Sequence, residues 1–132
     1  MKQILLVSND TIGNEDFVSE LRKKYEVDDV GYIQTALYKL RHPESFGLII
    51  IEVGMPPYNL YSLKETEDGH KTGIIFYEQA VKQLSIPVIF WSWSDEFRDE
   101  ISELDGCDII FVKKELDENH LLIAATEFVG DL

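Results

Sequence analysis

The chain has 132 residues, 45% of them hydrophobic and 28% charged, and a formal net charge of −13. This length and composition predict a single domain over residues 1–132, with a hydrophobic core that needs no disulfide or metal. The acidic charge argues against nucleic acid and anionic membranes as partners, because binding phosphate groups requires a basic surface.

Short apolar runs alternate with segments of helical spacing along the whole chain. In chain order they predict a strand at 4–7, a helix at 15–24, a weak strand at 26–30, a helix at 33–40, a strand at 48–52, a helix at 74–84, a strand at 86–92, a helix at 95–104, a strand at 109–112 and a helix at 118–128. The strands are continuous apolar runs, which is typical of parallel strands buried on both faces. The order therefore predicts an α/β fold: a doubly wound, five-stranded parallel sheet with helices on both faces.

Residues 56–71 form a long segment without periodicity, between the strand at 48–52 and the helix at 74–84. Loops of this length inside a compact domain are uncommon and are often functional or mobile. Tyr58 and Tyr61 lie in this loop and are candidate contacts, either with the domain itself or with a partner.

Polar residues follow four of the five predicted strands. Ser8 and Asn9 follow the first, Glu52 ends the third, Ser92 ends the fourth and Lys113 follows the fifth. Ligands bind at the carboxyl ends of the strands in open α/β sheets, so we expect these side chains to gather in one site. The plainer interpretation is that Glu52 is a polar strand end that faces solvent, as most acidic residues do.

Cysteine and histidine give no sign of a metal site. The single cysteine, Cys107, precedes an apolar run and is expected to be a buried, unreactive thiol in a reducing compartment. His42, His70 and His120 are far apart in the sequence and are expected at the surface. The first apolar run is too short for a signal peptide and none reaches membrane-spanning length, so we expect a cytoplasmic protein.

Three segments resemble the receiver (CheY-like) domain of two-component response regulators. Residues 48–56, Leu-Ile-Ile-Ile-Glu-Val-Gly-Met-Pro, resemble the receiver strand that ends in the phosphoacceptor Asp and is followed by two variable residues and Met-Pro. Residues 86–92 resemble the Pro-Val-Ile strand that ends in the family's Thr or Ser, and residues 106–113 resemble the Gly-Ala run that leads to its Lys. The resemblance implies a flavodoxin-like (βα)5 fold with strand order 2-1-3-4-5.

The chain departs from the receiver pattern at the positions that carry the chemistry. Ser8 and Asn9 stand where receivers have two acids that hold Mg²⁺, and Glu52 stands in place of the phosphoacceptor Asp. Lys114 replaces the proline that usually follows the Lys. The loop at residues 56–71 is about ten residues longer than the short connections usual at this point.

These departures predict a site without a metal. Mg²⁺ requires several hard oxygen ligands, and here only Glu52, with Asp10 and the Gly54 backbone as weak candidates, would supply them. We expect no cofactor, with Mg²⁺ doubtful. An ion pair between Glu52 and Lys113, with Ser92 and Asn9 hydrogen-bonded nearby, would be a permanent version of the contacts that phosphate makes in receivers.

The resemblance therefore predicts a stand-alone pseudo-receiver: a signalling module without catalytic residues that acts by binding protein. Its partner would be a histidine kinase, another response regulator or an output protein. Trp91 and Trp93 are candidate contacts beside the site, together with the two loop tyrosines. The fourth and fifth helices, which receivers commonly use for dimers or output, would be the surface for a homodimer.

Two alternatives stay open. The first is a Mg²⁺-dependent receiver that is phosphorylated with an unusual ligand set, through Asp10 and Glu52. The second is a small flavodoxin-like enzyme or ligand-binding module, with a pocket beneath the loop at residues 56–71. The sequence offers that second alternative no Gly-rich phosphate loop and no nucleophile elbow.

Overall fold

Five parallel strands form one sheet in this computed structural model, which describes residues 2–106 and 108–132. The expectation for Cys107 lies outside the described residues. The strands are β1 (Gln3–Val7), β2 (Val27–Val30), β3 (Phe46–Glu52), β4 (Val88–Ser92) and β5 (Ile109–Lys113). Their order is β2-β1-β3-β4-β5, which confirms the predicted order 2-1-3-4-5 and places the weak, acid-containing strand at an edge.

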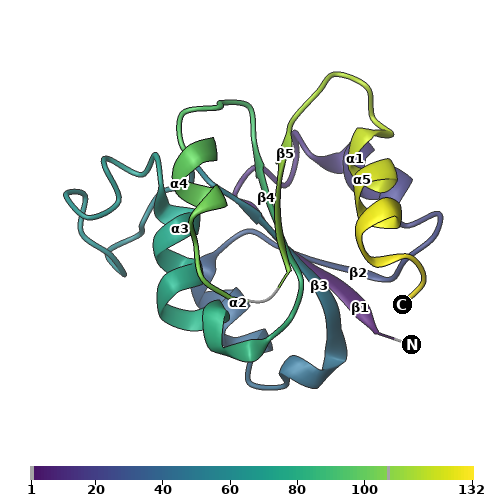
Figure 1. The fold of residues 1–132 in the computed structure, drawn as a ribbon, viewed down its shortest axis with the longest axis horizontal. Coiled ribbons are helices and arrows are strands. Elements are labelled where there is room, and N and C mark those ends of the chain that lie inside the picture. The colour runs from purple at the N-terminus through teal and green to yellow at the C-terminus, as the bar shows by residue number, and fades with distance from the viewer. Residues whose placement is uncertain (1, 107) are drawn as a thin grey trace.

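Helices cover both faces of the sheet (Figure 1). They are α1 (Glu15–Leu21), α2 (Ile33–Lys39), α3 (Thr72–Phe76), α4 (Arg98–Ser102) and α5 (His120–Val129). The helix α3 continues as a π-helical segment, η2 (Tyr77–Val81), and a 3₁₀ turn, η3 (Lys82–Leu84); another 3₁₀ turn, η1 (Pro43–Ser45), precedes β3. In Figure 1, α1 and α5 lie on one side of the sheet, and α2, α3 and α4 lie on the other.

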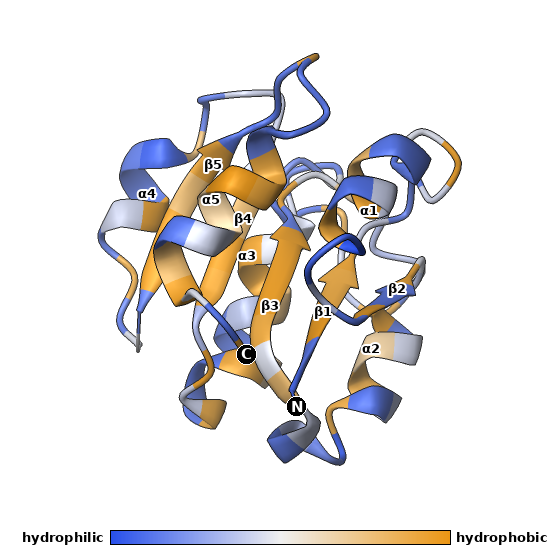
Figure 2. Ribbon diagram, turned by 90° about the vertical axis from the view of Figure 1, so that its right-hand side faces the viewer, coloured by the Kyte–Doolittle hydropathy of each residue, from blue (hydrophilic) through white to orange (hydrophobic). Residues whose placement is uncertain are grey.

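Alternate residues of each strand pack into two separate cores. Leu6, Ile50 and Trp91 point toward α1 and α5, whereas their neighbours Ile51 and Phe90 point toward α2, α3 and α4. Because both sets are buried, the strands read as continuous apolar runs. Figure 2 shows this pattern: β1, β3, β4 and β5 are mostly hydrophobic, the edge strand β2 is partly hydrophilic, and other hydrophilic residues concentrate on the helices and loops.

Three helices are shorter than the sequence spacing predicts. The helix α1 ends at Leu21, and residues 22–24 form a turn. The helices predicted to start at 95 and 118 begin later, and a turn occupies each predicted start. Ser94 Oγ accepts the Glu96 N–H in the first turn, and Asp117 Oδ1 accepts the Asn119 N–H in the second. Ser94 and Asp117 therefore each cap a turn, and the helices α4 and α5 begin only several residues after these capping residues.

Gly73 brings the start of α3 directly against the end of β3. Its N–H donates to the Val53 carbonyl at 2.9 Å. A Cβ atom at this position would clash with the Glu52 carbonyl oxygen and would lie 2.9 Å from Ile51 Cγ2. The backbone contact therefore fixes α3 beside the residue that ends β3. Within the described chain, no helix is long and apolar enough to cross a membrane.

Candidate functional site

A buried ion pair lies at the carboxyl edge of the sheet. Glu52, the last residue of β3, has its Oε2 atom 2.5 Å from Nζ of Lys114, and its Oε1 atom accepts a hydrogen bond from Ser8 Oγ at 2.5 Å. Ser8 follows β1 and Lys114 follows β5, so the three side chains come from the ends of three strands. Glu52 is only 8% exposed and Lys114 3%, so Glu52 does not face solvent.

Asn14 closes these three residues into a ring. Its Nδ2 donates to Ser8 Oγ at 2.7 Å, and its Oδ1 accepts a hydrogen bond from Lys114 Nζ at 3.2 Å. Asn14 occupies the N-cap position of α1, but its side chain makes no cap hydrogen bond. The amide instead joins the ring of Glu52, Ser8, Asn14 and Lys114.

Trp91 forms the wall of this ring. Its indole centroid lies 4.0 Å from Lys114 Nζ, within range of a cation–π contact. Trp91 is fully buried in β4, with Phe17 packed edge-on at 5.3 Å. The prediction that Trp91 is a partner contact is wrong, because its side chain lies in the core under α1 and α5. Trp93, beyond the end of the strand, is 52% exposed and stays a candidate contact.

The predicted ion pair between Glu52 and Lys113 is also wrong, because Glu52 pairs with the next residue, Lys114. Lys113 is the last residue of β5, and its Nζ lies 2.9 Å from Asp95 Oδ2 at the surface. Successive residues of a strand point to opposite sides, so Lys113 and Lys114 cannot both reach Glu52. Hydrogen bonds from Lys113 and then Arg98 lower the pKa of the Asp95 carboxyl. The side chains of these three residues are each about half exposed, so Lys113 belongs to a surface cluster.

The other predicted members of the site lie at its edge. Ser92 Oγ accepts the Ser94 N–H at 3.1 Å, and its carbonyl accepts the Lys114 N–H at 2.8 Å, so Ser92 positions the backbone of Lys114. Asn9 is exposed, and it is its neighbour Ser8 that reaches Glu52. Asp10 is exposed as well, and its Oδ1 accepts the Gly13 N–H at 3.0 Å.

The residues of this site do not fit Mg²⁺. Among the described residues, no group of three or more His, Cys, Asp or Glu side chains is placed to hold a metal ion. The carboxylate of Glu52 already contacts the ammonium of Lys114, which supplies a positive charge beside it. Mg²⁺ requires near-octahedral oxygen ligands, and a buried ammonium at 2.5 Å occupies the space beside the carboxylate that such an ion needs.

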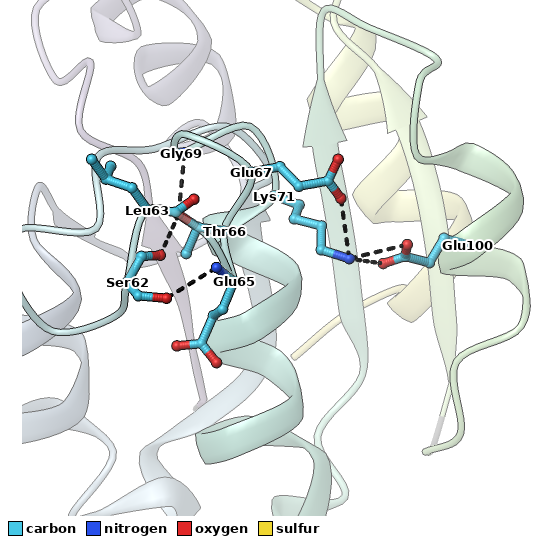
Figure 3. A network of polar contacts seen from close by, with 8 residues as sticks. All are labelled: Ser62, Leu63, Glu65, Thr66, Glu67, Gly69, Lys71 and Glu100. Carbon is cyan, nitrogen blue, oxygen red and sulfur yellow. Dashed lines mark hydrogen bonds and ion pairs between the residues drawn. The ribbon is translucent and has the colours of Figure 1, made fainter.

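The loop at residues 56–71 is folded into successive turns. Thr66 is fully buried, donates to the Ser62 carbonyl at 2.9 Å and accepts the Gly69 N–H at 3.2 Å (Figure 3). Figure 3 also shows Lys71 between Glu67 and Glu100, with Nζ distances of 3.4 and 3.3 Å, which ties the loop to α4.

The two loop tyrosines differ in exposure. Tyr58 is 41% exposed, and the centroid of its ring lies 5.1 Å from that of Tyr32. Tyr61 instead packs against the core, and burial raises the pKa of its hydroxyl. The hollow beside them is lined by residues 57–63 alone, so it is a feature of the loop and not a pocket above Glu52.

The strand order and the two-sided helix layers are those of response regulator receiver domains. A scan against protein-family models gives no match for this sequence, and a search of curated proteins gives none. Solved structures do match. The response regulator TrrA from Thermotoga maritima, in complex with Mg²⁺ and BeF, is 22% identical, covers 97% of this chain and 99% of its own, and has a TM-score of 0.72.

Two further structures show the same likeness. A CheY-like receiver domain protein from Methanospirillum hungatei is 22% identical over 96% of this chain and 92% of its own, with a TM-score of 0.70. The chemotaxis protein CheY4 from Vibrio cholerae is 19% identical over 97% of this chain and 98% of its own, with a TM-score of 0.61. At these identities, the likeness establishes the receiver fold.

Proposed function

We propose that this domain acts in signal transduction as an atypical receiver that binds another signalling protein and is not phosphorylated on a strand-end carboxylate. The observation that carries the proposal is the buried ion pair between Glu52 and Lys114. In this view the domain is not an enzyme, uses no metal and has lost the chemical part of the receiver switch. The partner would be a histidine kinase, a response regulator or an output protein.

The chemistry of phosphoryl transfer supports this proposal. An acceptor carboxylate must be reached in line by the phosphoryl donor, and a metal must neutralise the phosphate charge. Both oxygens of Glu52 already have partners, Ser8 and Lys114, and the side chain is buried. A phosphoryl group would have to displace both contacts without a metal to replace the charge of Lys114.

The face formed by α4, β5 and α5 is the surface that we propose for partner binding or a homodimer. The helix α4 has a single turn, and a hollow of about 500 Å³ between it and β5 is lined in part by the half-buried side chains of Leu104, Ile109 and Phe111. Ile123 on α5 is 52% exposed and lines a second groove at the same β5 edge, together with Arg98 and Phe111. Aromatic and aliphatic side chains in such a hollow are typical anchors of protein interfaces.

Tryptophan fluorescence tests the loss of phosphorylation. In a Trp93→Phe background, Trp91 is the remaining tryptophan and lies against Lys114. Titration with Mg²⁺ and then with beryllofluoride, a phosphoryl mimic, is expected to give no saturable change in the native site. A Mg²⁺-dependent saturable change, or a gain of one phosphoryl mass after incubation with acetyl phosphate, would overturn the proposal.

A second variant shows whether the rest of the switch survives. The triple substitution Ser8→Asp, Asn9→Asp and Glu52→Asp restores the carboxylates that the receiver resemblance implies. A Mg²⁺-dependent response in this variant but not in the native site would identify the missing ligands as the cause of the loss.

A further inference from the structure

His120, the first residue of α5, has its tautomer defined by two ring contacts. Its Nε2 lies 2.9 Å from Nε1 of Trp91, and its Nδ1 lies 2.8 Å from the Asp117 carbonyl oxygen. An indole N–H can only donate, so Nε2 must accept that bond. The ring proton is then on Nδ1, where it donates to the Asp117 carbonyl. This arrangement fits a neutral imidazole.

Trp91 connects His120 to the buried ion pair. The imidazole ring is inclined at 29° to the indole, with ring centroids 5.9 Å apart, and the ammonium of Lys114 lies 4.0 Å from the indole centroid. Phe17 of α1 packs edge-on against both rings, at 5.3 Å from Trp91 and 5.2 Å from His120. Any displacement of the indole therefore moves the wall against which Lys114 is held.

We propose that His120, Trp91 and Lys114 form a proton-sensitive link between the start of α5 and Glu52. Protonation of Nε2 places two N–H donors face to face, so the bond between His120 and Trp91 breaks. The imidazolium turns toward solvent, and the buried indole N–H loses that acceptor. Lys114 then lies against an indole that has lost its hydrogen bond to α5, and its contact with Glu52 weakens. Because coupling between two sites is reciprocal, a change at Glu52 also alters the proton affinity of His120.

Charges of both signs surround this histidine. The groove that contains His120 is also lined by Arg98 on α4, Lys113 on β5, Glu115 and Asp117 before α5, and Glu127 on α5. Lys114 lies beyond Trp91, and Glu118, two residues before His120, interacts with Asp16 and Glu20 on α1. Glu115, Asp117 and Glu127 line the same groove as His120 and would stabilise an imidazolium turned outward. The charge of Asp16 raises the pKa of the Glu118 carboxyl, so an effect of Glu118 on the indole signal must be distinguished from an effect of His120.

Nuclear magnetic resonance tests this link without any partner, so its outcome is independent of the proposed function. The indole ¹H–¹⁵N signal of Trp91, assigned in a Trp93→Phe background, is followed from pH 8 to pH 5 beside the imidazole ¹⁵N signals of His120. Histidine is the side chain that ordinarily titrates in this range. We expect the indole signal to shift with the same midpoint as the imidazole, and Glu52→Gln to move that midpoint.

Matched variants separate the link from general effects of pH. The indole shift should disappear in His120→Gln and persist in His70→Gln, which changes an exposed histidine in the loop, and in Glu118→Gln. An indole signal that stays flat while His120 titrates would overturn the proposal, as would a midpoint that Glu52→Gln leaves unchanged. If His120→Gln does not fold, the proposal is still tested by comparing the indole signal of Trp91 with the imidazole signals of His120 in the protein that keeps all its histidines.

Discussion

The ammonium of Lys114 and the carboxylate of Glu52 pair at 2.5 Å while only 1% and 10% of their side chains are exposed. Removing two charges from water is costly, so such a pair is maintained only where its other polar atoms are also satisfied. Ser8 and Asn14 supply these contacts. The pair is therefore a fixed part of the fold, and either residue alone would be a buried, uncompensated charge.

Lys114→Met should destabilise the domain strongly. It leaves Glu52 buried without its cation, and breaking a buried pair in this way costs about 3–5 kcal/mol of unfolding free energy. Lys113→Met is the matched control, because Lys113 pairs with Asp95 at the surface, where an ion pair contributes about 0–1 kcal/mol. Urea denaturation of both variants measures the difference. The double variant Glu52→Gln with Lys114→Met should lose less than Lys114→Met alone, and equal losses would contradict the buried pair.

Gly73→Ala should disturb the junction between β3 and α3. The added methyl meets the Glu52 carbonyl and Ile51, and overpacking of this kind costs about 1–3 kcal/mol. Gly54→Ala is the control, since its Cβ would find its nearest atom, the His70 carbonyl oxygen, at 3.8 Å. We expect that change to stay within about 0.5 kcal/mol. Thermal unfolding distinguishes the two, and equal stability would show that the junction is not tightly packed.

Asp29 predicts a stability that depends on pH. Its Oδ1 is buried without a hydrogen-bond partner among the described residues, and burial is the largest cause that raises the pKa of its carboxyl above 3.8. The folded state therefore binds this proton more tightly than the unfolded state, and stability falls as pH rises from 3.8 through the raised pKa. At neutral pH the charged carboxylate carries the full cost.

Asp29→Asn should accordingly stabilise the domain at pH 7, and the gain should shrink as the pH is lowered toward 4. Asp28→Asn is the matched control on the same strand, because Asp28 pairs with Lys39 at 2.9 Å and gains nothing by losing its charge. Urea denaturation at several pH values measures both. A gain for Asp29→Asn that is independent of pH would assign the effect to side-chain shape and not to charge.

Most of the fold follows from the sequence because short apolar runs alternate regularly with segments of helical spacing. Both helix layers agree with the pattern, the strand order agrees with what the receiver resemblance implies, and Glu52 does lie at the centre of a polar site. Helix ends are less accurate because Ser94 and Asp117 cap isolated turns as readily as helices. A capping side chain specifies a chain reversal, but packing decides whether a helix continues from it.

The site could be predicted only in outline, because its details depend on single-residue alternation. Two consecutive lysines end β5, and the pattern of residue types alone does not show which one points inward. The same difficulty applies to Trp91, whose buried position depends on its facing α1 and α5. Asn14 was missed as a site residue, since an Asn at a helix start resembles an ordinary N-cap.

The long loop has a further consequence through the way its ends meet. The Met55 N–H donates to the Gly69 carbonyl at 3.0 Å, and Thr72 Oγ1 donates to the Met55 carbonyl, so the chain leaves and re-enters the domain at almost one point. Lengthening a loop whose ends are already joined costs little entropy. The tip at residues 57–63 is thus a suitable graft position for an epitope or a sensor peptide, whereas the same insertion at Thr66 would break the hydrogen bonds of this buried side chain with Ser62 and Gly69.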